Sequence, residues 1–155
     1  MRNLILLSCF VFILSCATIP TGPLQSDEVR LTNLKIVETQ IESQTKPSYS
    51  AVIEYQHGGI IKSKDIASVC TTLIWDVTTW TGYSSRSEGP NCRKPSEIND
   101  SVIKTRDFVL DNGPTIKDNG YTIKAYAIYN VDGKEKKSNI ISLNYRITLV
   151  SLEDK

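Results

Sequence analysis

The sequence predicts a single all-β domain of the sandwich class, and three observations support this. Six or seven segments alternate between apolar and polar residues with a period of two, which is typical of half-buried strands. Turn residues separate these segments at short intervals. No segment has a convincing helical period, so two packed sheets are the expected architecture.

The first half of the domain contains three predicted strands. Residues 29–36 alternate with a one-residue slip near Asn33, which predicts a strand with a bulge. Residues 49–56 alternate cleanly and predict a half-buried strand. Residues 67–77 are rich in Val, Thr, Ile and Trp, so they predict a third strand, with Trp75 in the core.

Residues 78–100 predict a long polar loop, because they contain two glycines and two prolines and show little alternation. Loops of this length are usually functional or disordered. Four of its side chains combine the aromatic and guanidinium chemistry of recognition surfaces and form the candidate partner-binding site: Trp80, Tyr83, Arg86 and Arg93. The alternative is an excursion held by a disulfide, whose aromatics cap the core or extend a hairpin.

The second half of the domain contains three more predicted strands, at residues 102–110, 121–129 and 141–149. Strong turn signals lie between them, at Asp111-Asn112-Gly113-Pro114, at Asp118-Asn119-Gly120 and at Asp132-Gly133.

The segment 116–147 resembles the last two strands of immunoglobulin-like and fibronectin type III-like domains. In those domains a tyrosine opens the penultimate strand and an Asp-Gly loop leads to the last one. The likeness rests on Tyr121, Ile123, Ala125, Asp132-Gly133 and Ser138-Asn139. It implies one immunoglobulin-like β-sandwich over residues 28–155, with Tyr121 as the corner tyrosine. The antibody-type disulfide between the sheets does not carry over, because the penultimate strand has no cysteine.

Residues 1–15 have the features of an export signal. Arg2 gives a positive start, and the apolar run from Leu4 to Leu14 follows it. At ~1.5 Å per residue this run is roughly half the ~30 Å that a spanning helix needs. A short apolar core behind a basic start is typical of a signal peptide.

The sequence Ile13-Leu14-Ser15-Cys16 resembles the lipobox of bacterial lipoproteins, in which a cysteine thiol receives a diacylglycerol. The resemblance implies a lipid attached at Cys16 and fatty acyl chains such as palmitate, which hold a protein stably at a membrane. Ala17 is not Asp, which in enteric bacteria favours the outer membrane. The expected location is therefore the cell envelope, with the protein anchored by lipid in the outer membrane. The alternative is cleavage after Ala17, which would release a secreted soluble domain.

Residues 16–27 are expected to comprise the lipidated cysteine and a flexible tether with two prolines and a glycine. Fully extended, residues 17–26 of this tether would lift the domain roughly 30 Å from the bilayer.

The composition excludes several classes of partner. Removal of residues 1–15 removes Arg2 and no acid, so Lys+Arg falls from 18 to 17 against 17 Asp+Glu. A near-neutral chain argues against nucleic acid and against a polybasic membrane patch. Cys70 and Cys92 are expected to form a disulfide in an oxidising compartment. With His57 as the only histidine, no metal site and no cofactor are expected.

Catalysis is not expected either. The sequence contains no G-x-S-x-G, no H-E-x-x-H and no Gly-rich phosphate loop, so no catalytic residue is proposed. The expected function is that of a membrane-anchored, non-catalytic binding module whose partner would be a protein or a glycan. The alternative is a structural accessory lipoprotein of an envelope or secretion assembly.

Overall fold

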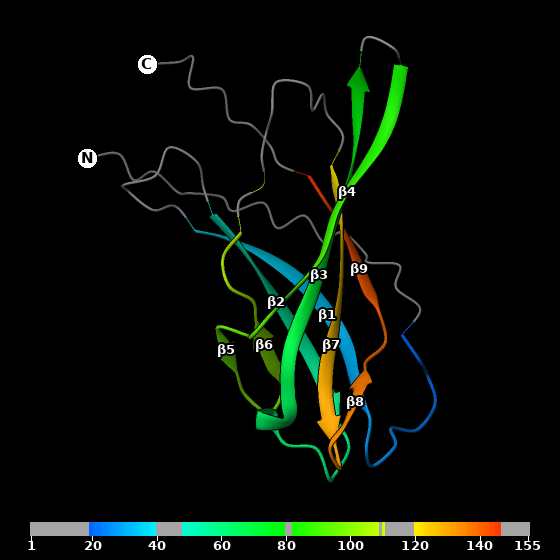
Figure 1. Cartoon of the computed structure of the whole chain (residues 1–155), viewed down its shortest axis with the longest axis vertical. Coiled ribbons are helices and arrows are strands. Elements are labelled where there is room, and N and C mark those ends of the chain that lie inside the picture. Colours follow the sequence, from blue (N-terminus) through cyan, green and yellow to red (C-terminus); the bar gives the residue numbers. More distant parts are fainter. Residues whose placement is uncertain (1–18, 40–47, 80–81, 109, 111–119, 147–155) are drawn as a thin grey trace, which may run out of the picture.

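Two antiparallel β-sheets form the fold in the computed structural model, which describes residues 19–39, 48–79, 82–108, 110 and 120–146 (Figure 1). The predicted all-β sandwich is therefore confirmed. The first sheet has the strand order β1-β2-β6-β5, and the second has the order β4-β3-β7-β8, with β9 also paired to β7. The elements are β1 (Val29–Thr39), β2 (Ser48–His57), a 3₁₀ turn (Ser63–Asp65), β3 (Ile66–Thr79), β4 (Gly82–Arg93), β5 (Glu97–Ile98), β6 (Val102–Lys104), β7 (Tyr121–Val131), β8 (Lys134–Lys137) and β9 (Ile141–Tyr145).

The strand order is that of immunoglobulin-like domains, in which strands A, B, E and D form one sheet and strands C, F and G form the other. Strands β1, β2, β6 and β5 occupy the positions of A, B, E and D. Strands β3, β7 and β9 occupy those of C, F and G, and β4 adds an edge strand next to C. Tyr121 opens β7, as the resemblance implied, and its side chain is buried.

The core lies between the sheets and follows the predicted alternation of β2 and β7. Every second side chain of these two strands is buried: Tyr49, Ala51, Ile53 and Tyr55 from β2, and Tyr121, Ile123, Ala125, Ala127 and Tyr129 from β7. Burial of one large apolar side chain contributes about 1.5–3 kcal/mol. Trp75 is half-buried and packs against this core, with its ring centroid 5.9 Å from that of Tyr121.

The slip predicted near Asn33 is a real irregularity of β1. The register between β1 and β2 shifts between Leu31 and Asn33. The side chain of Asn139, which precedes β9, binds the backbone of Leu31 at this shift. Its Oδ1 accepts a hydrogen bond from the Leu31 N–H at 2.7 Å, and its Nδ2 donates to the Leu31 carbonyl at 2.9 Å. This amide therefore joins the two sheets along the flank formed by β1 and β9.

The hairpin between β7 and β8 turns through the predicted Asp132-Gly133 pair. Both residues have positive φ, at 50° and 74°, and Val131 pairs with Lys134 across them. Positive φ at both central residues is the geometry of a type I′ turn, which matches the twist of the flanking strands.

The prediction of a long loop at 78–100 was wrong for most of its length. Gly82–Arg93 form β4, which pairs with β3 from Thr79 to Val69. β4 is the edge strand of its sheet, and its side chains from Ser84 to Arg93 are exposed. A strand at an edge does not need apolar residues to pair, so its polar composition resembled that of a loop.

The strand predicted over 102–110 was also only partly correct. It forms β6 at Val102–Lys104 and then leaves the ladder, and Phe108 returns to Tyr49 in an isolated bridge. At the break, the Thr105 hydroxyl oxygen accepts a hydrogen bond from the Ala51 N–H at 2.9 Å. A side chain thus replaces a carbonyl as the acceptor in the ladder.

Several predictions concern residues outside the described part of the chain. These are the signal at 1–15, the lipid site at Cys16, the aromatic ring of Trp80, the turn at 111–114, most of the turn at 118–120, and residues 147–149 of the last strand.

Candidate functional site: the cleft beside strand β4

Strand β4 directs four polar side chains toward the inner side of the sandwich. Residues that pair directly across two strands lie on the same face of the sheet. Three residues of β3 that pack against the core, Val69, Leu73 and Trp75, pair with Arg93, Glu88 and Arg86, and Thr71 between them pairs with Asn91. The inner face of β4 therefore carries Arg86, Glu88, Asn91 and Arg93.

The structure brings together two of the four residues in the predicted partner-binding site. Arg86 and Arg93 share the inner face of β4, although a simple count of seven positions would place them on opposite faces. The register shift between Thr71 and Leu73 places one extra residue in β4, and this returns the two arginines to the same face. Tyr83 lies in β4 opposite Thr78, and its side chain, like Trp80, is outside the described part of the chain.

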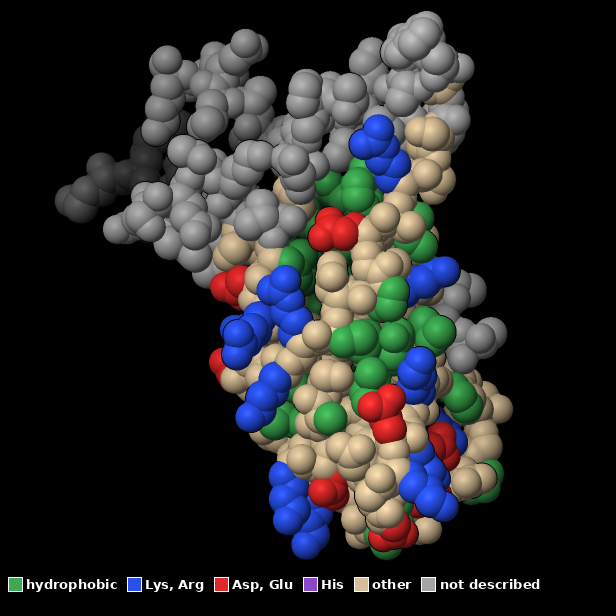
Figure 2. Space-filling view, in the orientation of Figure 1, with side chains coloured by type: hydrophobic (Ala, Val, Ile, Leu, Met, Phe, Trp, Pro, Cys, Tyr) green, Lys and Arg blue, Asp and Glu red, His purple; other side chains and the backbone are tan. Residues whose placement is uncertain are grey.

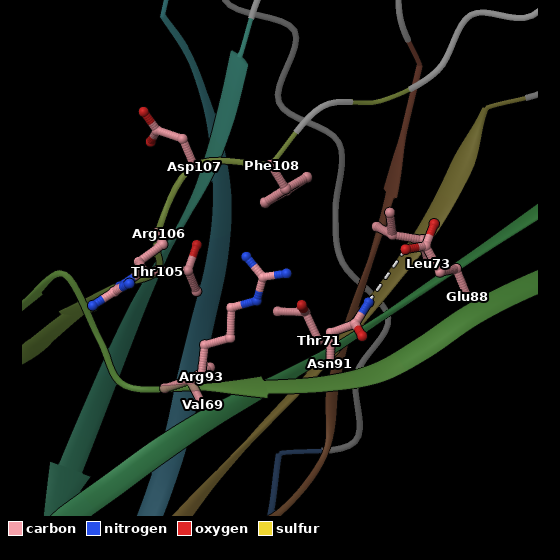
Figure 3. A pocket seen from close by; sticks show the side chains of 10 residues that line it. All are labelled: Val69, Thr71, Leu73, Glu88, Asn91, Arg93, Thr105, Arg106, Asp107 and Phe108. Carbon is pink, nitrogen blue, oxygen red and sulfur yellow. Dashed lines mark hydrogen bonds between the residues drawn. The ribbon is translucent and has the colours of Figure 1, made fainter.

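A cleft of about 320 Å³ opens between this face of β4 and the segment that follows β6. Its lining comes from β3, β4 and the segment that follows β6: Val69, Thr71, Leu73, Glu88, Asn91, Arg93, Thr105, Arg106, Asp107 and Phe108. Figure 3 shows the guanidinium of Arg93 rising from β4 into the middle of the cleft, close to Thr71 and Thr105, while the Phe108 ring closes the far side. Arg106 and Asp107 point away from the middle.

The guanidinium of Arg93 has no ion pair and no hydrogen bond within the described residues. The nearby Glu88 carboxylate instead accepts a hydrogen bond from the Asn91 amide at 3.4 Å (Figure 3). An arginine with unused donors, next to hydroxyl groups and an aromatic ring, has the chemistry to bind a carboxylate in a bidentate manner. The site can therefore recognise an anion and orient the group attached to it.

The predicted disulfide is present and supports one wall of this cleft. Cys70 and Cys92 pair directly across β3 and β4, and their sulfurs are bonded. Cys70 also pairs with Tyr126 of β7. The bond therefore lies on the outer side of the sheet and fixes the backbone next to Arg93 without occupying the cleft.

The free edge of β4 is protected from pairing with another strand. Charged side chains that point inward and a bulge are features by which proteins prevent pairing at an exposed edge. β4 has both, since Arg86 and Arg93 point inward and the register shifts near Gly89. We therefore expect a partner to enter the cleft rather than extend the sheet.

Sequence reasoning missed the residues that complete the cleft. Thr105 and Phe108 belong to a segment predicted as a regular strand, and only the break at Thr105 places them at the cleft. Glu88 and Asn91 could have been found, because polar residues recur at positions 86, 88, 91 and 93 with one bulge between them.

A comparison with known protein families, with curated proteins and with solved structures found no match to this chain. Within the residues that the structure describes, no helix is long and apolar enough to cross a membrane. The same residues contain no group of three His, Cys, Asp or Glu side chains that could hold a metal ion.

Proposed function

We propose that this chain is a lipid-anchored lipoprotein of the cell envelope, and that its sandwich is a non-catalytic binding module. The observation that carries the second part is the cleft beside β4, into which Arg93 projects with a guanidinium that has no partner among the described residues. The partner is a protein or glycan that presents a carboxylate to Arg93 and an apolar group to Phe108.

The proposed anchor is supported by the lipobox-like sequence and by the use of the other cysteines. Cys9 lies within the proposed signal, and Cys70 is bonded to Cys92. Cys16 is then the only thiol of the mature chain. We expect radiolabelled palmitate to be incorporated into the wild-type protein and not into Cys16→Ala. An unlabelled wild-type protein whose N-terminus is Thr18 would contradict the anchor.

The cleft is tested by photo-crosslinking in intact cells, with a benzophenone amino acid at one of two adjacent positions of β4. Glu88 lines the cleft, whereas Ser87 pairs with Ile74 on the opposite face. We expect a defined adduct from position 88 and none from position 87, identified by mass spectrometry. Equal adducts from both positions, or none from either, would contradict a partner at the cleft.

The role of Arg93 is tested in the same cells against a matched control. Arg93→Ala removes the guanidinium from the cleft, and Arg86→Ala removes one from the same face outside the cleft lining. A hydrogen bond to a charged group is worth about 1.5–3 kcal/mol, so Arg93→Ala should lower the adduct yield by about tenfold or more. Arg86→Ala should leave the yield nearly unchanged.

The alternative function, that of a structural accessory lipoprotein, predicts a different result. A structural accessory lipoprotein would co-purify with one large assembly, and deletion of its gene would disturb that assembly. A binding module should instead give a single partner whose capture depends on Arg93.

A further inference from the structure

The segment that enters the domain is fastened to it by Arg30. This side chain is only 9% exposed, and its Nη1 donates hydrogen bonds to the carbonyls of Pro20 and Gly22, at 3.1 and 2.6 Å. Its Nη2 donates to the Pro23 carbonyl at 3.5 Å and to the Glu28 carboxylate at 3.0 Å. A single buried guanidinium therefore holds the start of residues 20–28, which we name the strap.

The second half of the strap is held by the loop that follows β2. The Gly58 N–H donates to the Glu28 carbonyl at 2.8 Å, and the Ile60 N–H donates to the Ser26 carbonyl at 3.2 Å. A methyl group at Gly58 would lie 2.1 Å from the Gln25 carbonyl oxygen, so only glycine lets the strap approach this closely. The Asp27 carboxylate also pairs with Lys136 of β8.

The strap shortens the reach of the proposed lipid anchor. Only Ala17, Thr18 and Ile19 separate Cys16 from Pro20. Four steps of the backbone span at most roughly 14 Å, whereas the whole segment would span roughly 30 Å if it were free. A lipid on Cys16 would therefore hold Arg30 and its neighbours close to the bilayer surface.

The strap and the cleft lie on opposite flanks of the sandwich. Strands β1 and β9 make contact at one flank, and the strap joins β1 through Arg30 and β8 through Asp27 (Figure 1). The cleft is lined by residues of β3, β4 and the segment that follows β6, and the ends of β4 and β6 lie side by side at the other flank in Figure 1. Two exposed isoleucines, Ile19 and Ile140, border the strap flank, one before Pro20 and the other after the Asn139 that binds Leu31.

We infer that the strap orients the domain, with the β1/β9 flank toward the bilayer and the cleft beside β4 turned away from it. This inference rests on the proposed anchor at Cys16. On the face seen in Figure 2, lysines and arginines are interspersed with acidic side chains. This face therefore has no patch of one charge that would orient the domain at a bilayer. The anchor and the strap together leave the cleft accessible to a partner beyond the membrane.

The test uses the mature chain from Cys16, coupled through that thiol to a maleimide lipid in nanodiscs. Because Cys70 and Cys92 are bonded, Cys16 is the only site of coupling. Lipids with a paramagnetic headgroup then weaken the NMR signals of amides near the bilayer. We expect Leu31 and Ile140 to lose at least twice as much signal as Glu88 and Arg93. Equal losses on both flanks would overturn the inference.

Two variants separate the strap from other causes of orientation. Insertion of a Gly-Ser linker of about twelve residues between Ile19 and Pro20 leaves the strap intact and should equalise the losses, because it restores a long reach. Arg30→Ala should also equalise the losses, because it releases the strap. If Arg30→Ala does not fold, Gly58→Ala is used as the variant that releases the strap. An asymmetry that survives the inserted linker would overturn the inference.

The coupling is chemical, so this test does not depend on lipidation in the cell. An asymmetric signal loss together with absent palmitate labelling would support the strap geometry and refute the anchor. Palmitate labelling together with equal losses would support the anchor and refute the orientation.

Discussion

Gly89 of β4 approaches Thr71 of β3 so closely that a methyl group on Gly89 would lie 2.6 Å from the Thr71 carbonyl oxygen. Gly89 also has a φ of 104°, which side chains rarely adopt. This contact lies where the register of the two strands shifts. The shift keeps Arg86 and Arg93 on one face, so the inner face of β4 depends on a glycine at this point.

Gly89→Ala should therefore destabilise the protein more than a glycine substitution at an ordinary turn. Gly133→Ala is the matched control, because Gly133 also has positive φ but has open space around it. The unfavourable φ alone costs about 1 kcal/mol, and the clash at Gly89 adds more, so we expect a loss of about 2 kcal/mol or more for Gly89→Ala. Urea unfolding of both variants measures this, and equal losses would show that β4 shifts away at little cost.

The disulfide should stabilise the fold through the loop that it closes. Cys70 and Cys92 are 22 residues apart, and closure of such a loop is worth about 3 kcal/mol in the chain-entropy account. The double variant Cys70→Ala/Cys92→Ala should lose this amount in urea unfolding. Reduction of the wild-type protein should reproduce most of the loss. A loss below about 1 kcal/mol would mean that β3 and β4 remain paired in the unfolded chain.

The sheets could be predicted from the sequence because the central strands carry a clear signal. Tyr121 to Tyr129 and Tyr49 to Tyr55 alternate because one face of each strand is buried. The bulge near Asn33 could be predicted from the same alternation, because a bulge displaces the apolar residues by one position. The alternation is strongest where a strand is buried on one side and flanked by neighbours on both edges.

The candidate site could not be predicted in the same way, because its strand lies at an edge. β4 buries little side-chain surface, so no apolar pattern reveals it. The opposite wall follows a break in the ladder at Thr105, whose hydroxyl accepts the Ala51 N–H, and backbone hydrogen bonds with Tyr49 hold Phe108 there. Arg93 was identified by its chemistry, but its position required the register between β3 and β4.

Two buried tyrosines should respond in opposite ways to loss of their hydroxyl groups. The Tyr49 hydroxyl is buried and has no hydrogen-bond partner in the described part of the chain, whereas the Tyr55 hydroxyl donates to the Asn99 carbonyl at 2.5 Å. Tyr49→Phe should be neutral or stabilising, because it removes an unsatisfied polar group. Tyr55→Phe should lose about 1 kcal/mol of unfolding free energy. A loss of that size in Tyr49→Phe would reveal a partner for its hydroxyl.

The same Tyr49 hydroxyl should make the fold sensitive to alkali. Burial raises the pKa of Tyr49 from 10.0 to about 12. The folded state therefore keeps the proton that the unfolded chain releases, so stability is complete below pH 10 and declines as the pH rises toward 12. Tyr49→Phe should show a shallower decline over this range. Identical pH profiles for the two proteins would exclude Tyr49 as the cause.

Acid should loosen the strap before it unfolds the sandwich. The hydrogen bond and the positive charge of Lys136 hold the pKa of the Asp27 carboxyl below its ordinary value of 3.8. A depressed pKa means that the pairing contributes fully above pH 3.8 and is lost as the pH falls through the lowered value. The backbone N–H of Gln25 also lowers the pKa of the Glu28 carboxyl below its ordinary value of 4.5.

We expect the ¹⁵N heteronuclear NOE of the strap amides to fall between pH 5 and pH 2, while the signals of β7 stay unchanged. Asp27→Asn should have a lower NOE at neutral pH, because it lacks the charge that pairs with Lys136, and should change less on acidification. Glu28→Gln separates the second carboxylate, which acts through Arg30 rather than Lys136. Both groups are near the surface, so salt should weaken the effect. A strap that stays rigid in the double variant Asp27→Asn/Glu28→Gln would show that the carbonyl contacts of Arg30 hold it without either carboxylate.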